Sequence, residues 1–379
     1  MLTIDGSSGE GGGQVLRTAL SLAALLGRPI QIINIRAGRK QPGLRPQHVQ
    51  AVKAAAMICN AWMEGAREGS CELRFEPQTP PQAGTYRFEI GTAGAATLVL
   101  QTVLLPLALA GGPSTVVVRG GTHVAWSPPF DYVHQVYLPA LVPLGIRCQV
   151  ELVTWGFYPK GGGEIRATIE PVAIALAGLR PSQPPPASPA LAGLRPSQPP
   201  PWAQPRGELT ALSVLSAAAN VANQVTARQA SRAYNRLTAA RLAVTPQTQL
   251  LNPLSAGPGT CVFLLAEYEN GARAGFTGFG RQGYPAERVA DDAVDAFLAF
   301  HAANAPVDPH LADQLVLPLA LLGQPAAFRS SQITQHLLTN IWVVEQFLGP
   351  RFRVDGQTVE VGEIQSLKGL GQETGPSNS

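Results

Sequence analysis

The sequence predicts an α/β protein of the α+β kind, built from three repeated units that each place helices on one side of a mixed sheet. Three observations support this fold class. The order helix, strand, helix, two strands occurs twice in the first half of the chain and again near its end. A proline-rich segment separates the second occurrence from the third. Between that segment and the third occurrence lies a shorter pattern of strand, helix and two strands, which predicts a smaller inserted βαββ domain.

The first unit begins with a short apolar strand, a glycine-rich loop and a helix with a buried face. Its remaining elements alternate between the 3.6-residue period of helices and the two-residue period of strands. We expect strands at 2–4 and 30–36, helices at 14–26 and 47–62, and paired strands at 71–76 and 86–90.

The second and third units repeat this order. For the second unit we expect helices at 93–110 and 132–144 and strands at 114–119, 146–153 and 164–170. The third unit is expected within 283–362, with an extra helix at about 310–322. Residues 1–174 and 277–362 would then form one large domain, whose repeats span about 1–91, 92–174 and 277–362.

Residues 175–206 are predicted to be a linker, because they carry the same twelve residues, ALAGLRPSQPPP, at 175–186 and again at 190–201. Proline has no backbone N–H to donate, so such runs stay out of sheet interiors, and we expect an extended, solvated connection. A proline-rich docking motif is the alternative. The small inserted domain follows at 207–276, and 363–379 form a C-terminal tail. Within the insert we expect strands at 208–215, 248–251 and 261–269 and a helix at 221–242.

The bulk composition is that of a globular protein with a large core. The chain has 379 residues, 45% of them hydrophobic, a mean hydropathy of +0.07 and a net charge of +3. Its longest apolar stretch, 98–110, contains Gln101 and Pro106 and is too short to span a bilayer. The first residues lack the features of a signal peptide, and the four cysteines have no CxxC spacing. We therefore expect a cytoplasmic protein without a membrane anchor, and the small net charge alone does not indicate nucleic-acid binding.

Two glycine-rich loops, at 6–13 and 156–163, are candidate anion sites. Glycines before a helix start present backbone N–H groups with little side-chain bulk, which suits a phosphate. Neither loop has the spacing of a Walker A loop or of a dinucleotide-binding motif. Each could be a plain turn, but each also has a glutamate beside its glycines, Glu10 and Glu164. This pairing favours a shared anionic site.

A basic loop between the second expected strand and the second expected helix is a further candidate. Loops at such positions tend to bind ligands. Together with Arg17, its side chains could clamp a phosphate through charge-assisted hydrogen bonds, although a solvated basic loop is the plain alternative. Within 34–48 the chain carries four cations and a histidine: Arg36, Arg39, Lys40, Arg45 and His48.

Four segments together closely resemble the RNA 3'-terminal phosphate cyclases. They read, in order, IDGSSGEGGGQVLRTALSLAALLGRPIQIINIRAGRKQPGLRPQHV, GGTHVAWSPPFDY, GFYPKGGGEI and HLADQLVLPLAL, between Ile4 and about Leu322. The resemblance implies three helix-backed units similar to the C-terminal domain of translation initiation factor 3, plus a smaller inserted domain. The number of units and the βαββ insert expected from the periodicities agree with this.

The resemblance also implies a reaction and places its nucleophile at His310. In the family, the imidazole attacks the α-phosphorus of ATP and forms a covalent histidine–AMP. AMP then passes to the RNA 3'-phosphate, giving RNA(3')pp(5')A, and the neighbouring 2'-hydroxyl closes a 2',3'-cyclic phosphodiester. Imidazole suits this task, because it is neutral and nucleophilic near pH 7. Without the HLADQ motif, His310 would be read as an ordinary structural histidine.

Further roles carry over by resemblance. Glu10 corresponds to the ligand of Mg²⁺ or Mn²⁺, for which an oxygen donor is suitable, although a carboxylate near a helix start is also favoured by the helix dipole. The groups that hold the triphosphate and the RNA end are Arg17, Arg36, Arg39, Gln47 and His48. The ATP-binding residues are Gln101, Pro128, Tyr284, Pro285, Ala286, Glu287 and Arg288, with the adenine between Pro128 and Tyr284 unless Tyr284 is simply packed.

Two positions depart from the family pattern. Trp155 stands where arginine or histidine is usual, and His123 stands where many members carry aspartate or asparagine. We expect the first change to weaken a phosphate contact.

Two other functions are alternatives to the cyclase activity. A non-catalytic branch of the family serves ribosome biogenesis, but it lacks the nucleophile, so His310 favours the enzyme. An enolpyruvyl transferase of related architecture would leave His310 without a role. The physiological RNA, the preference between RNA and DNA ends and the oligomeric state stay open.

Overall fold

The structure is a computed structural model that describes residues 1–172, 199–222, 224–322 and 325–362. Most of the duplicated proline-rich segment and the C-terminal tail therefore lie outside the described residues. Within the described part of the chain, no helix is both long enough and apolar enough to cross a lipid bilayer.

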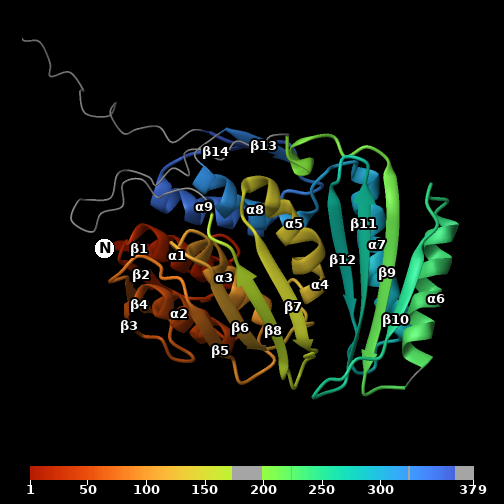
Figure 1. The fold of residues 1–379 in the computed structure, drawn as a ribbon, viewed down its shortest axis with the longest axis horizontal. Helices are drawn as coiled ribbons and strands as arrows, with labels where there is room; N and C mark the ends of the chain where they lie inside the picture. Colours follow the sequence, from red (N-terminus) through yellow and green to blue (C-terminus); the bar gives the residue numbers. More distant parts are fainter. Residues whose placement is uncertain (173–198, 223, 323–324, 363–379) are drawn as a thin grey trace, which may run out of the picture.

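Two four-stranded mixed sheets in the first half of the chain share one strand order (Figure 1). The strands expected to pair at 71–76 and 86–90 lie in different sheets, because a strand at Trp62–Glu64, where the end of a helix was expected, pairs with the first of them. In each sheet, the first two strands pair in parallel and the others pair antiparallel. The first sheet has the order β1 (Leu2–Asp5), β2 (Ile30–Ile33), β4 (Leu73–Glu76), β3 (Trp62–Glu64). The second has the order β5 (Thr85–Glu89), β6 (Ser114–Gly120), β8 (Gly163–Ile169), β7 (Cys148–Thr154).

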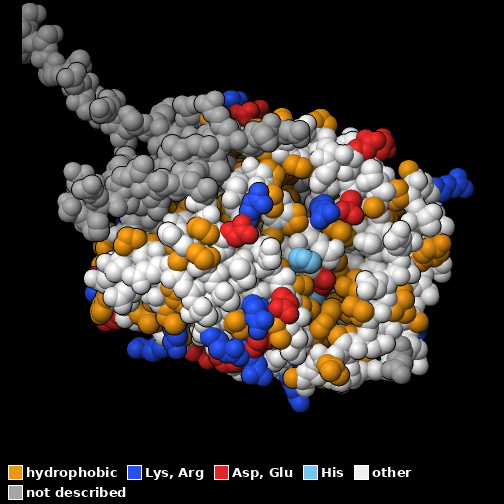
Figure 2. Space-filling model, in the orientation of Figure 1, with side chains coloured by type: hydrophobic (Ala, Val, Ile, Leu, Met, Phe, Trp, Pro, Cys, Tyr) orange, Lys and Arg blue, Asp and Glu red, His pale blue; other side chains and the backbone are white. Residues whose placement is uncertain are grey.

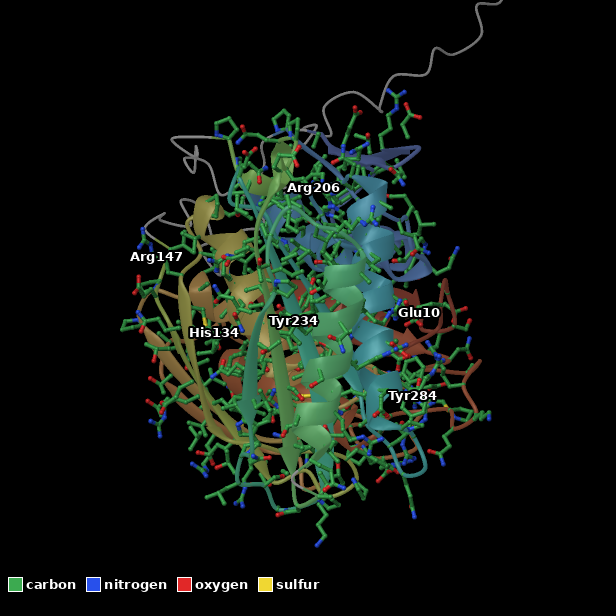
Figure 3. All side chains as sticks on the ribbon, turned by 90° about the vertical axis from the view of Figure 1, so that its right-hand side faces the viewer. Glu10, His134, Arg147, Arg206, Tyr234 and Tyr284 are labelled. Carbon is green, nitrogen blue, oxygen red and sulfur yellow. The ribbon has the colours of Figure 1, made fainter. Side chains whose placement is uncertain are left out.

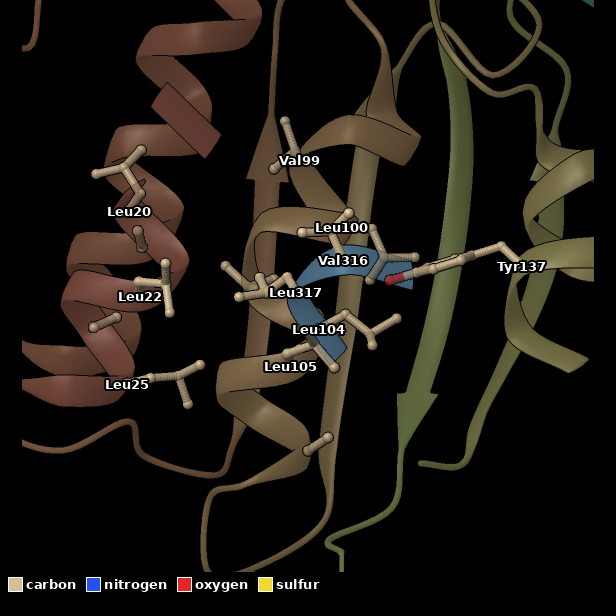
Figure 4. Close-up of a cluster of buried hydrophobic side chains, with 14 of the residues drawn as sticks. Leu20, Leu22, Leu25, Val99, Leu100, Leu104, Leu105, Tyr137, Val316 and Leu317 are labelled. Atoms are coloured by element: carbon tan, nitrogen blue, oxygen red, sulfur yellow. The ribbon is translucent and has the colours of Figure 1, made fainter. Parts of the chain in front are cut away.

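Five helices build the main core. Apolar side chains of α1, α3 and α8, including Leu20, Leu104 and Val316, meet there (Figure 4). The helices of the two ends of the chain are thus joined in one core, which fixes the loops at their N-termini relative to one another. The five helices are α1 (Gly13–Leu26), α2 (Pro46–Cys59), α3 (Ala96–Ala108), α8 (Pro309–Leu322) and α9 (Gln335–Leu348).

Strands from the last part of the chain form a third sheet in the order β13 (Ala326–Arg329), β15 (Thr358–Val361), β14 (Phe352–Asp355). The sequence of elements α8, β13, α9, β14, β15 matches the repeated pattern of helix, strand, helix, two strands. The helix expected as an extra element, α8, therefore takes the first helical position of this unit.

The inserted segment forms a fourth sheet, and it holds more elements than the expected βαββ pattern. β12 (Arg273–Phe279) was not predicted, because the glycines in its sequence, RAGFTGF, weaken the pattern typical of a strand. α7 (Ala286–Ala303) packs on this sheet through Val289, Val294 and Phe297. The sheet order is β10 (Gln247–Leu251), β9 (Leu209–Ala219), β11 (Gly259–Tyr268), β12, with α6 (Gln224–Ala239) beside α7.

The helix expected at 132–144 is divided. It consists of α4 (Phe130–Tyr132), a π-helical turn η1 (Val133–Tyr137), α5 (Leu138–Leu141) and a 3₁₀ turn η2 (Val142–Leu144). Pro139 and Pro143 lack the backbone N–H that a regular helix needs, which accounts for the change of helix type. π-helical turns occur often at functional sites.

The described end of the predicted linker is packed, which corrects the expectation of a solvated chain there. The Trp202 indole N–H donates to the Ala140 carbonyl at 3.1 Å. The Arg206 guanidinium lies 4.4 Å from the ring centre of Tyr268 and 5.0 Å from that of Phe300. An aromatic residue and a stacked arginine anchor the chain where it enters the insert.

Candidate functional site

The candidate site lies on one side of the molecule, where the loops after β1 and β2 meet the starts of α8 and α9. Figure 3 shows Glu10, from the first glycine loop, and Tyr284, from the segment before α7, on the same side of the molecule. His134 and Arg147 lie on the opposite side. Segments far apart in the sequence therefore supply one surface.

The first glycine loop lets charged side chains approach its backbone closely. Gly9 and Gly11 have φ values of +62° and +58°, in the left-handed region that favours glycine. A side chain at Gly9 would overlap Thr339, and one at Gly13 would overlap His48 and Arg17. The Glu10 backbone N–H also donates to Thr339 Oγ1 at 3.0 Å, which ties the loop to α9. The glycines are needed for close packing as well as for turning.

Glu10 is the acidic centre of the site. Its carboxylate forms an ion pair with Arg39, and its Oε1 lies 3.5 Å from His336 Nδ1. Arg39 comes from the basic loop and His336 from the first turn of α9. His336 was not predicted from the sequence, because it lies in no motif and only the tertiary fold brings it close to Glu10.

The pKa of His336 depends on the charged groups around it. Burial lowers the pKa of His336, and the charge of Glu10 opposes this effect. Interactions with Arg17, His310 and Arg39 lower the pKa of His336 further. The predicted nucleophile, two predicted phosphate ligands and the predicted metal ligand therefore gather around one histidine.

Arg17 and Asp313 influence each other electrostatically at the base of the site. Burial lowers the pKa of Arg17 to about 10, and the negative charges of Asp313 and Glu10 oppose this. Burial raises the pKa of Asp313 to about 8, and Arg17 opposes that shift. Arg17 also donates to Gln14 Oε1 at 2.8 Å. Arg17 is therefore a desolvated cation that can bind an anion.

His48 is buried as a neutral ring. Its Nδ1 accepts the Arg45 backbone N–H at 3.0 Å, so the donor-capable nitrogen is Nε2, on the side of Gly13 and Arg17. Burial, followed by the charges of three nearby arginines, lowers the pKa of His48 to about 3. The neutral ring can donate one hydrogen bond to an anion beside Arg17.

A pH dependence of stability follows from His48. The unfolded chain binds a proton on this histidine near pH 6.5, whereas the native state does not until about pH 3. The free energy of unfolding should therefore fall as the pH drops from about 6.5 toward 5. Urea denaturation at several pH values measures the free energy of unfolding. Over this interval, that free energy should change less with pH in His48→Gln than in the unmodified protein. An equal change in both proteins would contradict the prediction.

His310 is exposed and lies at the second position of α8, whose start is capped by Asp308. The Asp308 carboxyl group accepts the backbone N–H groups of His310 and Leu311 at 2.9 and 3.0 Å. It also accepts the hydroxyl of buried Tyr132 at 2.9 Å. The Tyr132 ring meets the His310 ring edge-on, with centroids 6.2 Å apart. Residues on α4 and at the start of α8 thus fix the backbone that carries the imidazole.

Two residues assigned to phosphate binding make contacts within the protein. Arg36 donates to the carbonyls of Gln41 and Gly43, at 2.9 and 2.8 Å, and so closes the basic loop. Gln47 Oε1 accepts the Ala95 backbone N–H at 2.8 Å and so joins α2 to the start of α3. In this structure both shape the loops around the site.

Gln101 is linked to α8, the helix that carries His310. Its amide donates to Gln314 Oε1 at 2.7 Å, and Gln314 in turn donates to the His310 carbonyl at 2.8 Å. On the other loop, the Pro128 carbonyl accepts the Thr97 hydroxyl at 2.8 Å. These contacts set Gln101 and Pro128 on the frame that holds His310.

The remaining residues assigned to ATP lie at the start of α7. The Tyr284 hydroxyl donates to Asp292 at 3.0 Å, and the Arg281 guanidinium lies 3.7 Å from its ring centre. Glu287 forms a two-point ion pair with Arg228 of α6 at 2.8 Å. Pro285 precedes the helix, Ala286 begins it, and Arg288 is exposed. An arginine stacked on Tyr284 marks a ring face that accepts a flat partner.

The second glycine loop has its contacts near the β5 to β8 sheet. Gly156 and Gly163 pack against each other, and Gly161 packs on the backbone of Thr92 and Ala93. Glu164 pairs with Arg87 of β5 at 2.9 Å. The expectation that both loops form one anionic site is therefore not supported by their contacts, because the second loop serves the β5 to β8 sheet.

The two departures from the family pattern form a single stacked pair. The rings of His123 and Trp155 lie 3.9 Å apart at an interplanar angle of 11°. His123 Nε2 lies 2.8 Å from Asp131, and its Nδ1 lies 2.9 Å from Thr122 Oγ1. The two unusual residues therefore pack against each other. This stacking is a structural reason for a tryptophan at position 155.

The sequence is similar to one family of known proteins. Residues 8–354 match the family described as "RNA 3'-terminal phosphate cyclase". The RNA 3'-terminal phosphate cyclase of Nostoc punctiforme is 45% identical over 98% of this chain and 99% of its own length. That of Methylococcus capsulatus is 46% identical over 96% and 94%, and that of Pyrobaculum neutrophilum is 39% identical over 93% and 94%. Among solved structures, the enolpyruvyl transferase NikO from Streptomyces tendae is 17% identical, with a TM-score of 0.24 over 63% of this chain and 38% of its own.

Proposed function

Because the chain belongs to the RNA 3'-terminal phosphate cyclase family and is an enzyme of that activity, we propose that it works through a covalent AMP on His310. The observation that carries this proposal is the exposed imidazole at the capped start of α8, beside Tyr132. ATP would supply the AMP, and an RNA with a 3'-terminal phosphate would receive it.

The chemistry balances in three displacements. A nitrogen of His310 bonds to the α-phosphorus of ATP as the bond to pyrophosphate breaks, and the imidazole loses its proton. An oxygen of the RNA 3'-phosphate then bonds to that phosphorus, and the bond to His310 breaks. The 2'-hydroxyl finally attacks the activated 3'-phosphorus, loses its proton, and expels AMP. The product is a 2',3'-cyclic phosphodiester.

The charged groups of the site suit this sequence of phosphates. Arg17 is a desolvated cation, Arg39 pairs with Glu10 through an exposed side chain, and His48 offers a neutral N–H. Positive and neutral donors at fixed positions stabilise charge that develops on a transferring phosphoryl group. In our proposal these groups hold the triphosphate and then the RNA end, with Arg36 and Gln47 shaping the loops that carry them.

The residues fit a Mg²⁺ or Mn²⁺ ion held by one protein carboxylate. No group of three or more His, Cys, Asp and Glu side chains that could hold a metal occurs in the described part of the chain. Mg²⁺ is commonly bound by one or two carboxylates plus phosphates and water, so Glu10 alone is a sufficient protein ligand. When bound, the ion would neutralise phosphate charge.

The proposal extends to domain organisation and location. We propose a catalytic domain formed by 1–174 and 277–362 with three repeats like the C-terminal domain of translation initiation factor 3, a linker at 175–206 and an insert at 207–276. The packing of α7 on the insert favours an insert that extends to about Ala303. We also propose that the enzyme acts in the cytoplasm.

Incubation with ATP, Mg²⁺ and a 3'-phosphorylated RNA tests the function. We expect the terminal phosphate to become resistant to phosphatase, and to become sensitive again after mild acid opens the cyclic ester. An RNA whose phosphate stays phosphatase-sensitive would contradict the proposal.

Tyr284 should serve ATP through its ring. Tyr284→Ala is expected to raise the KM for ATP about tenfold or more, because one aromatic stack on a base is worth about 1–3 kcal/mol. Tyr284→Phe loses only the hydrogen bond to Asp292 and should have a much smaller effect. Self-adenylylation measured against ATP concentration distinguishes the two variants. Equal damage would indicate that the hydroxyl is the important group.

Tyr132 should act on His310 through Asp308. Tyr132→Phe keeps the ring but removes a hydrogen bond to a buried carboxyl group, so we expect unfolding to become easier by about 1.5–3 kcal/mol. The rate of AMP transfer to His310 should fall while the KM for ATP changes little. Single-turnover labelling at saturating ATP measures this. A normal rate in a destabilised variant would limit Tyr132 to a structural role.

A further inference from the structure

Three loops carry the three most exposed large apolar side chains among the described residues. Trp126 is 99% exposed, Leu254 is 89% exposed and Tyr158 is 76% exposed. Single exposed apolar residues are common, but a cluster of this kind marks an interaction surface.

The loops form one surface. The His123 backbone N–H donates to the Gly156 carbonyl at 3.1 Å, which joins residues 121–129 to residues 155–163. Trp155 pairs with Ser255 through a β-bridge, and Gly257 lies against the Lys160 side chain, which joins 155–163 to 252–258. In Figure 1 the turn after β7 and the turn after β10 lie together at the lower edge. Figure 2 shows hydrophobic side chains near this edge, with Lys or Arg side chains beside them.

The backbone at Trp126 is strained, and the side chain makes no buried contact with the described residues that would offset the strain. Its φ is +66°, which a bulky residue rarely adopts and which typically costs about 1–3 kcal/mol. The ring is almost fully in solvent, so no buried contact offsets this cost within the described residues. Strain of this kind is usual where a loop presents a side chain to a ligand.

The loop that carries Trp126 leads to residues of the candidate site. Pro128 follows Trp126 by two residues and is fixed to α3 through Thr97. Tyr132, on the helix that this loop enters, contacts both Asp308 and the His310 ring. A strand whose 3'-end lies at His310 can therefore continue over these loops.

We propose that Trp126, Tyr158 and Lys160 form a platform for single-stranded RNA on the 5' side of its 3'-terminal phosphate. This inference rests on the proposed function. The two rings stack on nucleobases, exposed Lys160 pairs with a phosphodiester, and Leu254 covers one edge of a base. Exposed aromatic rings combined with a cation are the common means of holding a single strand without reading its sequence.

The test compares two double variants. Trp126→Ala with Tyr158→Ala should lower kcat/KM for an oligouridylate with a 3'-terminal phosphate by about tenfold or more, since stacking on each ring contributes substantially. Self-adenylylation of the same variant, which needs no RNA, should be unchanged. Trp126→Phe with Tyr158→Phe should retain most of the RNA activity, because the rings remain.

Trp62→Ala with Tyr234→Ala is the matched control, because Trp62 and Tyr234 are exposed at 49% and 38% on β3 and α6, outside the three loops. Its RNA activity should be normal. An undiminished RNA activity in the platform variant overturns the inference, as does an equal loss in the control. Loss of self-adenylylation would assign the rings to ATP, and a changed oligomeric state with normal RNA activity would assign the surface to a protein contact. An unmodified enzyme that forms no AMP adduct would instead refute the proposed function.

Discussion

His310→Ala is expected to abolish both the covalent AMP adduct and RNA cyclisation. The substitution removes the nitrogen that forms the bond to phosphorus, and no neighbouring group can replace a bond that must form and break in each cycle. The fold should be unaffected, since His310 is exposed and Asp308 caps α8 through backbone N–H groups. Labelling with α-³²P-ATP and a melting curve measure the two quantities.

His134→Ala is the matched control for this experiment. His134 is also exposed but lies on the opposite side of the molecule, where it stacks on Phe130 (Figure 3). Its loss should leave labelling unchanged. Protein-bound label in His310→Ala would contradict the assignment of the nucleophile.

Glu10→Gln is expected to lower self-adenylylation by about a hundredfold, the usual cost of removing one preorganised charged or polar group from a transition state. The variant keeps the size of the side chain but removes the carboxylate that pairs with Arg39 and faces His336. Extra Mn²⁺ should restore part of the rate if Glu10 holds the metal. The rate of label incorporation at several Mn²⁺ concentrations tests this.

Glu164→Gln provides the comparison, because Glu164 also lies next to three glycines but pairs with Arg87 of β5. We expect its self-adenylylation to stay near that of the unmodified enzyme. Comparable losses in both variants would mean that the second glycine loop serves the reaction after all.

Glu10 and Glu164 lie in similar sequences but have different contacts, so the sequence predicts only part of the structure. Periodicity predicted the α/β class and the repeated order of helices and strands along the chain, because apolar residues must face a core at the period of each element. It did not predict β12, whose glycines weaken the strand pattern, or the π-helical turn, which depends on prolines in a packed helix.

Within the site, the motifs that carry the family resemblance suggested His310 and Glu10, which lie in distinctive segments. They did not identify His336, Asp308 or Tyr132, which have ordinary sequence neighbours and reach the site only through the packing of α4, α8 and α9. The motifs also suggested that two similar glycine loops share a ligand, whereas their contacts differ. A repeated motif in a repeated unit reflects a common turn and need not reflect a common function.

The most direct test of the central claim is to locate the covalent AMP. The enzyme is incubated with ATP and Mg²⁺, digested, and analysed by tandem mass spectrometry under alkaline conditions, since a histidine–phosphorus bond is labile in acid. We expect AMP on the peptide that contains His310, and its release when 3'-phosphorylated RNA is added before digestion. AMP on a lysine or on another histidine, or an adduct that RNA does not discharge, would contradict the account.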